Sequence, residues 1–272
     1  MAHQNTAPCA GPQKGQHLLM IHGMFSGAWC WDAYREFFER RGYCCHVPNL
    51  LHHDVDPKAA PVRELGTTSL TDYVADLEAL ITGMPEPPII MGHSMGGLLA
   101  QKLATKGLAK KLVLLTPAPP GGINVLKWSV IRSFSGLFKT WHFWAKPYRL
   151  SFNAAVYAPM RLLPPQDQKS IYEKLVWESG RVVSEVGLWF LDPTGASRVD
   201  ETKVTCPVLI VSGSKDRMTP AAVMRKIYEK YHQVATYKEF DNHGHWIIGE
   251  QGWEEIADFI CDWLTNGDTS GG

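Results

Sequence analysis

A serine lies between two glycines in the pentapeptide Gly-His-Ser-Met-Gly at 92–96, with Ser94 at its centre. The pentapeptide fits the G-x-S-x-G pattern, in which the serine lies on a sharp turn between a buried strand and a helix. An apolar run at 88–91 precedes it, and Gly92 and Gly96 leave room for such a turn. We therefore predict that Ser94 is a nucleophile that attacks a carbonyl carbon. A phosphate-binding turn is the alternative, but its G-x-x-x-x-G-K and G-x-G-x-x-G spacings are both missing here.

Two histidines near the end of the chain could accept the proton of this serine. A serine hydroxyl needs such a base, and in strand–turn–helix architectures of this kind the chain order is serine, acid, histidine. The loop at 241–246 follows the last apolar run and contains His243 and His245. We predict His245 as the base, since it precedes the last helical stretch, and His243 remains the alternative.

An acidic residue must hold the histidine in the correct tautomer. Asp216 comes shortly after the apolar run at 208–211, which places it at the carboxyl end of a predicted strand. The rival position after the run at 111–115 is excluded, because no Asp or Glu occurs between residues 87 and 166. We therefore predict Asp216 as the acid. Three aspartates stay open as alternatives, with helix capping or a solvated loop as their ordinary roles: Asp192, Asp200 and Asp241.

Backbone N–H groups must meet the negative charge that develops on the carbonyl oxygen during acyl transfer. Met95 offers one such group, because it directly follows the serine at the start of a predicted helix. The second should come from the loop at 22–25, where Gly23 permits a tight turn after the first apolar run. We assign this second group to Met24 and expect His22 to brace the loop through hydrogen bonds.

Short apolar runs alternate with amphipathic stretches along most of the chain, which is typical of a mostly parallel sheet covered by helices. The predicted strands are 17–21, 44–48, 88–91, 111–115, 208–211 and 235–240. The predicted helices are 29–41, 70–82, 95–106, 220–231 and 252–264. We therefore expect an α/β protein with a sheet of about six strands, and flexible polar ends at 1–16 and 266–272.

The alternation stops between residues 117 and 206, a stretch too long for a structureless loop in a compact domain. We predict that 117–206 forms a helical cap, inserted before the penultimate strand of a core domain made of 1–116 and 207–272. At helical spacing, one side of this segment is apolar and the other is basic. The apolar side comprises Ile131, Phe134, Leu137, Phe138, Trp141 and Trp144, and the basic side comprises Arg132, Lys139 and Lys146.

The aromatic residues of this segment are candidates for substrate binding. Between residues 87 and 166 the chain has ten Lys and Arg and no acid, although its formal net charge is zero. We predict that the apolar side roofs a pocket for acyl or aromatic groups, while the basic side meets an anionic group or, transiently, a lipid surface. A packed amphipathic helix with a solvated basic face is the alternative. The predicted substrate-binding residues are Phe25, Trp128, Phe138, Trp141 and Trp144.

The composition excludes several classes of protein. A chain of 272 residues with 45% hydrophobic residues can bury a core, and without net charge it has no global field that attracts nucleic acid. Six cysteines without C-x-x-C spacing predict neither a disulfide framework nor a zinc site. His52, His53 and Asp54 have no further ligand nearby in sequence, so we expect no metal and no cofactor. Without a secretion signal or a long apolar span, we expect a cytoplasmic protein that acts on a small molecule.

The motifs resemble those of the α/β-hydrolase fold superfamily over nearly the whole chain. The resemblance rests on the segments around Gly23, Ser94, Asp216 and His245, in that order. The segment Gly-Ala-Trp-Cys-Trp at 27–31 is similar to the plant methylesterase and hydroxynitrile lyase branch, and 92–97 is similar to esterases and lysophospholipase-like members. One departure follows the second predicted strand, where the superfamily often has D-x-x-G-x-G-x-S and this chain has Asn-Leu-Leu-His-His-Asp at 49–54.

This resemblance implies a cofactor-independent serine hydrolase that cleaves carboxylic esters through an acyl-enzyme, with Ser94, His245 and Asp216 as its triad. Small to medium apolar or aromatic esters are the expected substrates. C–C hydrolases, hydroxynitrile lyases, lactonases and acyltransferases use the same scaffold and stay open as alternatives. A ligand-sensing protein that retains the triad and turns over slowly is a further alternative.

Overall fold

A computed structural model describes residues 15–124, 128–137, 140–231 and 233–266. Its centre is a six-stranded sheet with the order β2-β1-β3-β4-β7-β8, in which all neighbouring strands are parallel. The strands are β1 (His17–Ile21), β2 (Cys44–His46), β3 (Ile89–His93), β4 (Lys111–Leu115), β7 (Val208–Gly213) and β8 (Ala235–Phe240). The predicted α/β class and the predicted number of strands are confirmed.

The strand order changes direction between β1 and β3. From β1 the chain first adds β2 on one side, and then returns to add β3 on the other side. In open parallel sheets, ligands bind in the crevice at the carboxyl ends of the two strands beside such a change. Here the loop at 22–25 leaves the end of β1, and Ser94 follows the end of β3. The topology therefore brings the first two predicted site segments together.

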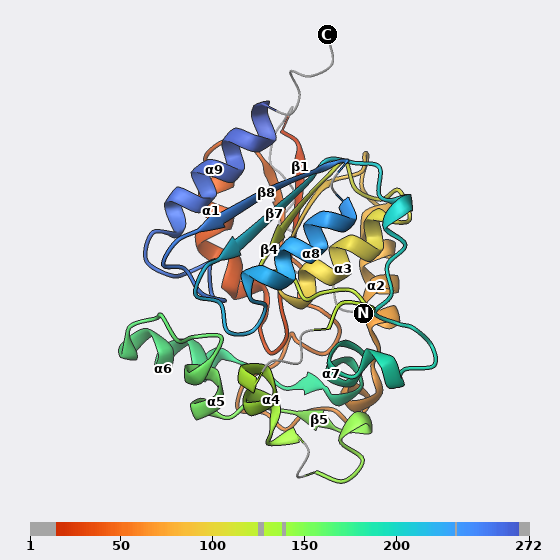
Figure 1. Cartoon of the computed structure of the whole chain (residues 1–272), viewed down its shortest axis with the longest axis vertical. Helices are drawn as coiled ribbons and strands as arrows, with labels where there is room; N and C mark the ends of the chain where they lie inside the picture. Colours follow the sequence, from red (N-terminus) through yellow and green to blue (C-terminus); the bar gives the residue numbers. More distant parts are fainter. Residues whose placement is uncertain (1–14, 125–127, 138–139, 232, 267–272) are drawn as a thin grey trace.

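Helices cover both faces of this sheet (Figure 1). α1 (Asp32–Glu39) and α9 (Trp253–Asn266) pack on one face, and α2 (Leu70–Thr82), α3 (Met95–Ala104) and α8 (Ala221–Tyr231) pack on the other. Successive residues of a strand point to opposite faces, so Leu19 and Leu18 of β1 join different cores. α2 begins where predicted, because Ser69 and Asp72 form a capping box.

The segment between β4 and β7 lies at the carboxyl end of the sheet, in the lower part of Figure 1. Its helices are α4 (Trp128–Phe134), α5 (Phe152–Tyr157), α6 (Pro165–Lys174) and α7 (Gly180–Gly187). The short strands β5 (Pro147–Tyr148) and β6 (Glu178–Ser179) form an antiparallel pair. Five 3-10 helices complete the described elements: η1 (Ala28–Trp31), η2 (Arg63–Thr67), η4 (Phe143–Ala145), η5 (Trp189–Leu191) and η6 (Glu201–Lys203). Within the described ranges, no helix has the length and apolar character needed to cross a membrane.

The prediction of one amphipathic helix from Ile131 to Trp144 is wrong. α4 ends at Phe134, a turn follows at residues 135 and 136, and η4 starts only at Phe143. Residues 135 and 136 are a serine and a glycine, which favour helix ends over helix interiors, and this explains the break. The predicted positions 138 and 139 lie outside the described residues.

Candidate active site

Ser94 occupies a strained turn between β3 and α3. Its φ of 53° and ψ of −119° lie in a region that residues other than glycine rarely adopt. The flanking glycines make the turn sterically feasible, because a Cβ on Gly92 would collide with the carbonyl oxygen of Gly96. A Cβ on Gly96 would collide in turn with the carbonyl oxygen of Ile21 at the end of β1. The small residues predicted beside the serine are therefore required by backbone packing.

The side chains of Ser94, His245 and Asp216 form one hydrogen-bonded chain. The Ser94 hydroxyl oxygen lies 2.9 Å from His245 Nε2, and His245 Nδ1 lies 2.8 Å from Asp216 Oδ2. The histidine backbone is held as well, because its carbonyl oxygen accepts a hydrogen bond of 2.8 Å from His93 Nε2. The three residues that the sequence singled out thus meet, although 151 positions separate Ser94 from His245.

Asp216 is buried and ionised. Its Oδ1 accepts hydrogen bonds from the backbone N–H groups of Met218 at 2.6 Å and Thr219 at 3.0 Å, and its Oδ2 accepts one from the Thr219 hydroxyl at 2.9 Å. Burial alone would raise the pKa of this carboxyl, but His245 and the hydrogen bonds outweigh it and hold the pKa below its usual range. An ionised carboxylate at Nδ1 can stabilise the imidazolium that forms when His245 accepts a proton.

The alternative base and acids lie elsewhere. His243 Nδ1 faces Glu250 at 3.4 Å from Oε2, instead of facing Ser94. Asp192 accepts hydrogen bonds from Thr194 and from the backbone of residue 196, as a loop-capping residue does. Asp200 accepts a hydrogen bond from Thr202, and position 241 is exposed. The geometry therefore favours the residues preferred from sequence over each alternative.

The loop after β1 packs directly against the serine. A Cβ on Gly23 would lie 3.0 Å from Ser94 Cβ, so a larger residue would push the loop away. His22 braces the loop as expected: its Nδ1 donates to the Gly23 carbonyl at 2.9 Å, and its Nε2 accepts from the Leu50 N–H at 3.1 Å. Burial lowers the pKa of His22 to about 3, which agrees with this neutral form. Met24 follows in this loop, and Met95 starts α3, where the first N–H groups of a helix have no intrahelical partner.

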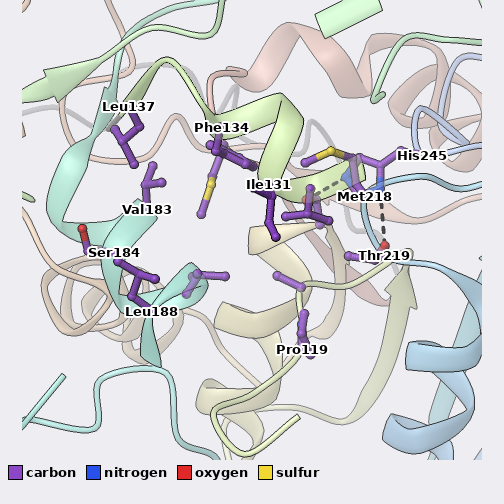
Figure 2. A pocket seen from close by; sticks show the side chains of 16 residues that line it. Pro119, Ile131, Phe134, Leu137, Val183, Ser184, Leu188, Met218, Thr219 and His245 are labelled. Carbon is purple, nitrogen blue, oxygen red and sulfur yellow. Dashed lines mark hydrogen bonds between the residues drawn. The ribbon is translucent and has the colours of Figure 1, made fainter. Parts of the chain in front are cut away.

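A largely apolar cavity opens above Ser94 and His245 (Figure 2). Figure 2 shows Ile131 and Phe134 of α4 opposite Val183 of α7. The lining residues are Met24, Ser94, Ala118, Pro119, Val130, Ile131, Phe134, Leu137, Val183, Ser184, Val186, Gly187, Leu188, Met218, Thr219 and His245. We call this space the α4–α7 cavity.

A second cavity also reaches Ser94 and His245, and we call it the loop cavity. Its lining residues are Gly23, Met24, Phe25, Ser26, His93, Ser94, Phe134, Leu150, Pro159, Met160, Leu175, Met218, His245 and Trp246. Ser94 and His245 therefore border two apolar spaces, one walled mainly by α4 and α7 and the other largely by the loop after β1 and residues 150–175.

The predicted aromatic lining is only partly in place. Phe25 borders the loop cavity, but Trp141 is 80% exposed, and neither Trp141 nor Trp144 borders either cavity at Ser94. The reason is that α4 ends at Phe134, so helical spacing no longer predicts where the side chains of later residues point. The side chain of Trp128 and all of Phe138 lie outside the described residues. The sequence did not predict that Val183 and Leu188 line the cavity, because a short run of apolar residues does not indicate which cavity it faces.

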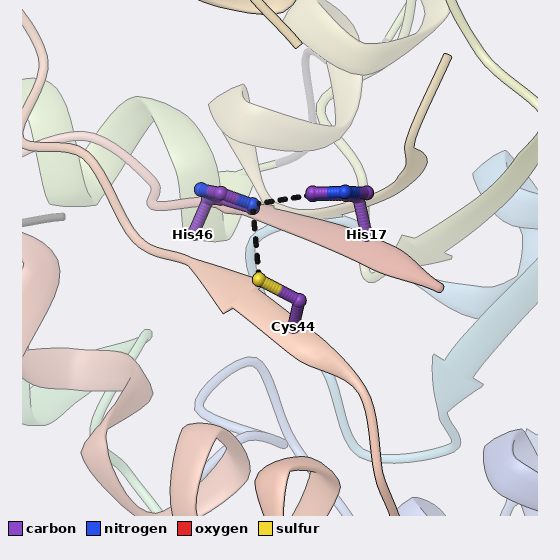
Figure 3. Close-up of side chains that lie close together, drawn as sticks. All are labelled: His17, Cys44 and His46. Carbon is purple, nitrogen blue, oxygen red and sulfur yellow. Dashed lines mark hydrogen bonds between the residues drawn. The ribbon is translucent and has the colours of Figure 1, made fainter. Parts of the chain in front are cut away.

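One cluster of side chains resembles a metal site but does not fit a metal (Figure 3). His17 Nδ1 and His46 Nε2 are 2.9 Å apart, and Cys44 Sγ lies 3.6 Å from the same His46 nitrogen. Cys44 is disulfide-bonded, a bond that the cysteine spacing did not predict, and so it offers no thiolate. His53, one of the two adjacent histidines considered as metal ligands in the sequence analysis, is instead hydrogen-bonded to a carboxylate. Its Nε2 lies 3.2 Å from Glu178 Oε2.

Comparison with known proteins shows which family and which structures this chain is similar to. The model of the alpha/beta hydrolase family matches residues 18–259. Methylesterase 3 of Arabidopsis thaliana is 31% identical over 94 residues, which are 32% of this chain and 32% of that protein. Norfluorocurarine synthase 1 of Strychnos nux-vomica is 33% identical over 87 residues, or 31% of each. The matched part thus spans about a third of the length of these curated relatives.

Solved structures share the fold over nearly the whole chain. A methylesterase from Arabidopsis has a TM-score of 0.70 at 13% identity, and the match covers 92% of this chain and 99% of that one. A monoacylglycerol lipase from Paleococcus ferrophilus has a TM-score of 0.68 at 20% identity, with 92% and 94% covered. A pyrethroid hydrolase from Sphingobium faniae has a TM-score of 0.69 at 20% identity, with 91% and 96% covered.

Proposed function

The chain belongs to the alpha/beta hydrolase family, and on this premise we propose that it is a serine hydrolase that cleaves carboxylic esters through an acyl-enzyme. One observation carries the proposal: the hydrogen-bonded chain from Ser94 through His245 to Asp216, which opens onto apolar cavities. A serine, a base and a buried carboxylate in this order are the groups that acyl transfer requires.

In the proposed reaction, His245 Nε2 takes the hydroxyl proton while Ser94 Oγ attacks the ester carbonyl carbon. The backbone N–H groups of Met24 and Met95 hold the resulting oxyanion. His245 then gives the proton to the leaving alcohol, and an acyl group stays on Ser94. In the second half, His245 takes a proton from a water molecule, whose oxygen attacks the acyl carbon. The bond between the acyl carbon and Ser94 Oγ then breaks, His245 returns the proton to Ser94 Oγ, and the acid leaves. Asp216 keeps the Nδ1 proton on His245 throughout and balances its positive charge.

The two apolar cavities beside Ser94 could hold apolar groups on both the acyl side and the alcohol side of an ester. Several relatives are named methylesterases, and in this chain a methyl ester would leave one apolar space beside Ser94 empty. We propose small to medium apolar or aromatic esters as substrates, and we propose that 117–206 acts as a cap, because α4 and α7 supply much of the α4–α7 cavity.

A direct test labels the nucleophile. A fluorophosphonate should modify Ser94 in the wild-type protein and leave the Ser94→Ala variant unlabelled, as read by mass spectrometry of the labelled peptide. Ester turnover in ¹⁸O-labelled water should put one heavy oxygen into the acid product, which distinguishes hydrolysis from lyase or acyltransferase chemistry. Absence of labelling at Ser94, or an acid free of heavy oxygen, would overturn the proposed function.

The length of the acyl chain should decide the rate. Each buried methylene contributes about 0.8 kcal/mol, so kcat/KM for p-nitrophenyl esters should rise about three- to fourfold per methylene from acetate to butyrate or hexanoate and then fall. Ile131→Phe narrows the α4–α7 cavity and should move this optimum to shorter chains. Trp141→Ala is the matched control, because Trp141 borders neither cavity. A decline from acetate onward, or a shift in the control as large as that in Ile131→Phe, would contradict the apolar-cavity model.

A further inference from the structure

A buried carboxylate outside the triad is hydrogen-bonded to the loop after β1. Glu178 of β6 is fully buried, and its Oε1 accepts from the Tyr73 hydroxyl at 2.8 Å and from the Ser179 N–H at 2.7 Å. Its Oε2 accepts from His53 Nε2 at 3.2 Å and from the Phe25 N–H at 3.4 Å. A carboxylate offers about four lone-pair sites, and here four donors are directed at them.

The charge of Glu178 is matched inside the protein. Burial alone would raise the pKa of Glu178, but His53 and the hydrogen bonds hold this pKa below its ordinary value. Burial likewise opposes a charge on His53, but the carboxylate of Glu178 outweighs it and raises the pKa of His53. Two neighbouring titratable groups stay neutral, because burial lowers the pKa of His22 to about 3 and raises the pKa of Tyr73 well above its usual value. Glu178 and His53 therefore form a buried ion pair.

The residue that Glu178 holds has an unusual backbone. Phe25 has a φ of 65°, in the left-handed region that side chains other than glycine seldom adopt. Its N–H donates to Glu178, and its carbonyl oxygen accepts from the Val176 N–H at 2.8 Å. Such conformations persist when the surrounding structure holds them from several sides. Both peptide groups of Phe25 are thus fixed by the chain at 176–178.

The position of Phe25 links this contact to the proposed chemistry. Phe25 directly follows Met24, the proposed oxyanion donor. Glu178 fixes the peptide group between Met24 and Phe25, and the Met24 N–H belongs to the preceding peptide, on the other side of the same Cα. An oxyanion donor works only if it is held at the place where the charge develops, and a misplacement of about 1 Å can lower a rate roughly 100-fold. The carboxylate therefore acts through the backbone and needs no contact with substrate.

We propose that Glu178 is a positioning residue for the oxyanion loop, residues 22–26, and that it ties this loop to the segment between β4 and β7. The proposal rests on the proposed function for its kinetic consequence. Its structural part, the hold on the Phe25 N–H, is independent of any activity. Met24 is then held in its productive orientation only while that segment is packed against the loop.

Glu178→Gln is the test variant, and Glu185→Gln is its matched control. Glu185 is also a buried carboxylate of the same segment, but its hydrogen bonds within the described part of the chain come from the Leu70 N–H and from Arg181, which lie outside the loop. A glutamine amide keeps the shape but has one acceptor oxygen, so it cannot receive all four donors at Glu178. Well below either melting temperature, Glu178→Gln should lower kcat about 10- to 100-fold with KM changed less than about threefold. Glu185→Gln should lose comparable stability and keep kcat near the wild-type value.

Amide hydrogen exchange supplies the second measurement, which needs no substrate. The Phe25 amide should exchange at least about tenfold faster in Glu178→Gln than in the wild type, and should stay protected in Glu185→Gln. An unchanged Phe25 amide, or equal losses of kcat in both variants, would overturn the proposal. If fluorophosphonate fails to label Ser94, the proposed function is wrong, and the exchange rates alone then decide whether Glu178 holds the loop.

Discussion

Replacing His245 with alanine is expected to lower kcat for ester hydrolysis by roughly 10⁴-fold or more, because the variant loses the base that is hydrogen-bonded to Ser94. Ser94→Ala should cost about as much. The double variant should be little worse than either single one, because members of a triad act as a unit. All variants should fold. Ser94→Ala removes a single oxygen, and although His245→Ala removes a buried imidazole, Asp216 keeps its hydrogen bonds from Met218 and Thr219.

His243→Ala is the matched control, two positions away in the same loop. His243 faces Glu250, so its loss should change kcat by less than about tenfold. Steady-state kinetics on a p-nitrophenyl ester, with circular dichroism to verify folding, measure all four variants. An active His245→Ala beside an inactive His243→Ala would show that the base has been assigned to the wrong residue.

Mild acid should destabilise the folded protein strongly. Burial lowers the pKa of both His22 and His93 to about 3, whereas an unfolded histidine titrates near 6.5. Between these values the unfolded chain binds protons that the folded chain does not, so the free energy of unfolding falls as pH falls. At pH 5 the loss is about 2 kcal/mol for each histidine and about 4 kcal/mol for both, a large part of the 5–15 kcal/mol of a typical domain.

The carboxyl groups act in the same direction at lower pH. The pKa values of Asp216 and Glu178 are lowered in the folded state, so their contribution is present above the unfolded pKa and is lost as pH falls through the folded one. Urea unfolding at pH 7, 6 and 5 measures the slope. The single variants His22→Gln and His93→Gln should each flatten it, whatever their stability at pH 7. A slope equal to that of the wild type in both variants would contradict the assignment of these two histidines.

The sequence predicted the sheet and the meeting of Ser94, His245 and Asp216 because both depend on local patterns. Buried parallel strands are short apolar runs, and the bounds of β1, β4 and β8 agree with the prediction to the residue. The carboxyl ends of parallel strands share one edge of the sheet, so an order of motifs along the chain becomes proximity in space. Ser94 and Asp216 needed no more information than that.

The walls of the site could not be predicted in the same way. Trp141 continued a helical spacing that the chain abandons after Phe134, and its exposure depends on a turn of only two residues. Glu178 had no visible pattern, because three of its four partners lie 105 to 153 positions away in the chain and only tertiary packing brings them together. Contacts of such separation leave no periodicity in a single sequence.

The strained turn at Ser94 has a consequence for the evolution of this chain. The conformation of Ser94, at φ 53° and ψ −119°, costs a residue with a side chain about 1–3 kcal/mol. Glycine has no Cβ and would avoid most of this steric cost. Random substitution followed by selection for stability alone would therefore remove the hydroxyl. If Ser94 is the nucleophile, as proposed, selection for stability without a demand for turnover is expected to lose this serine early.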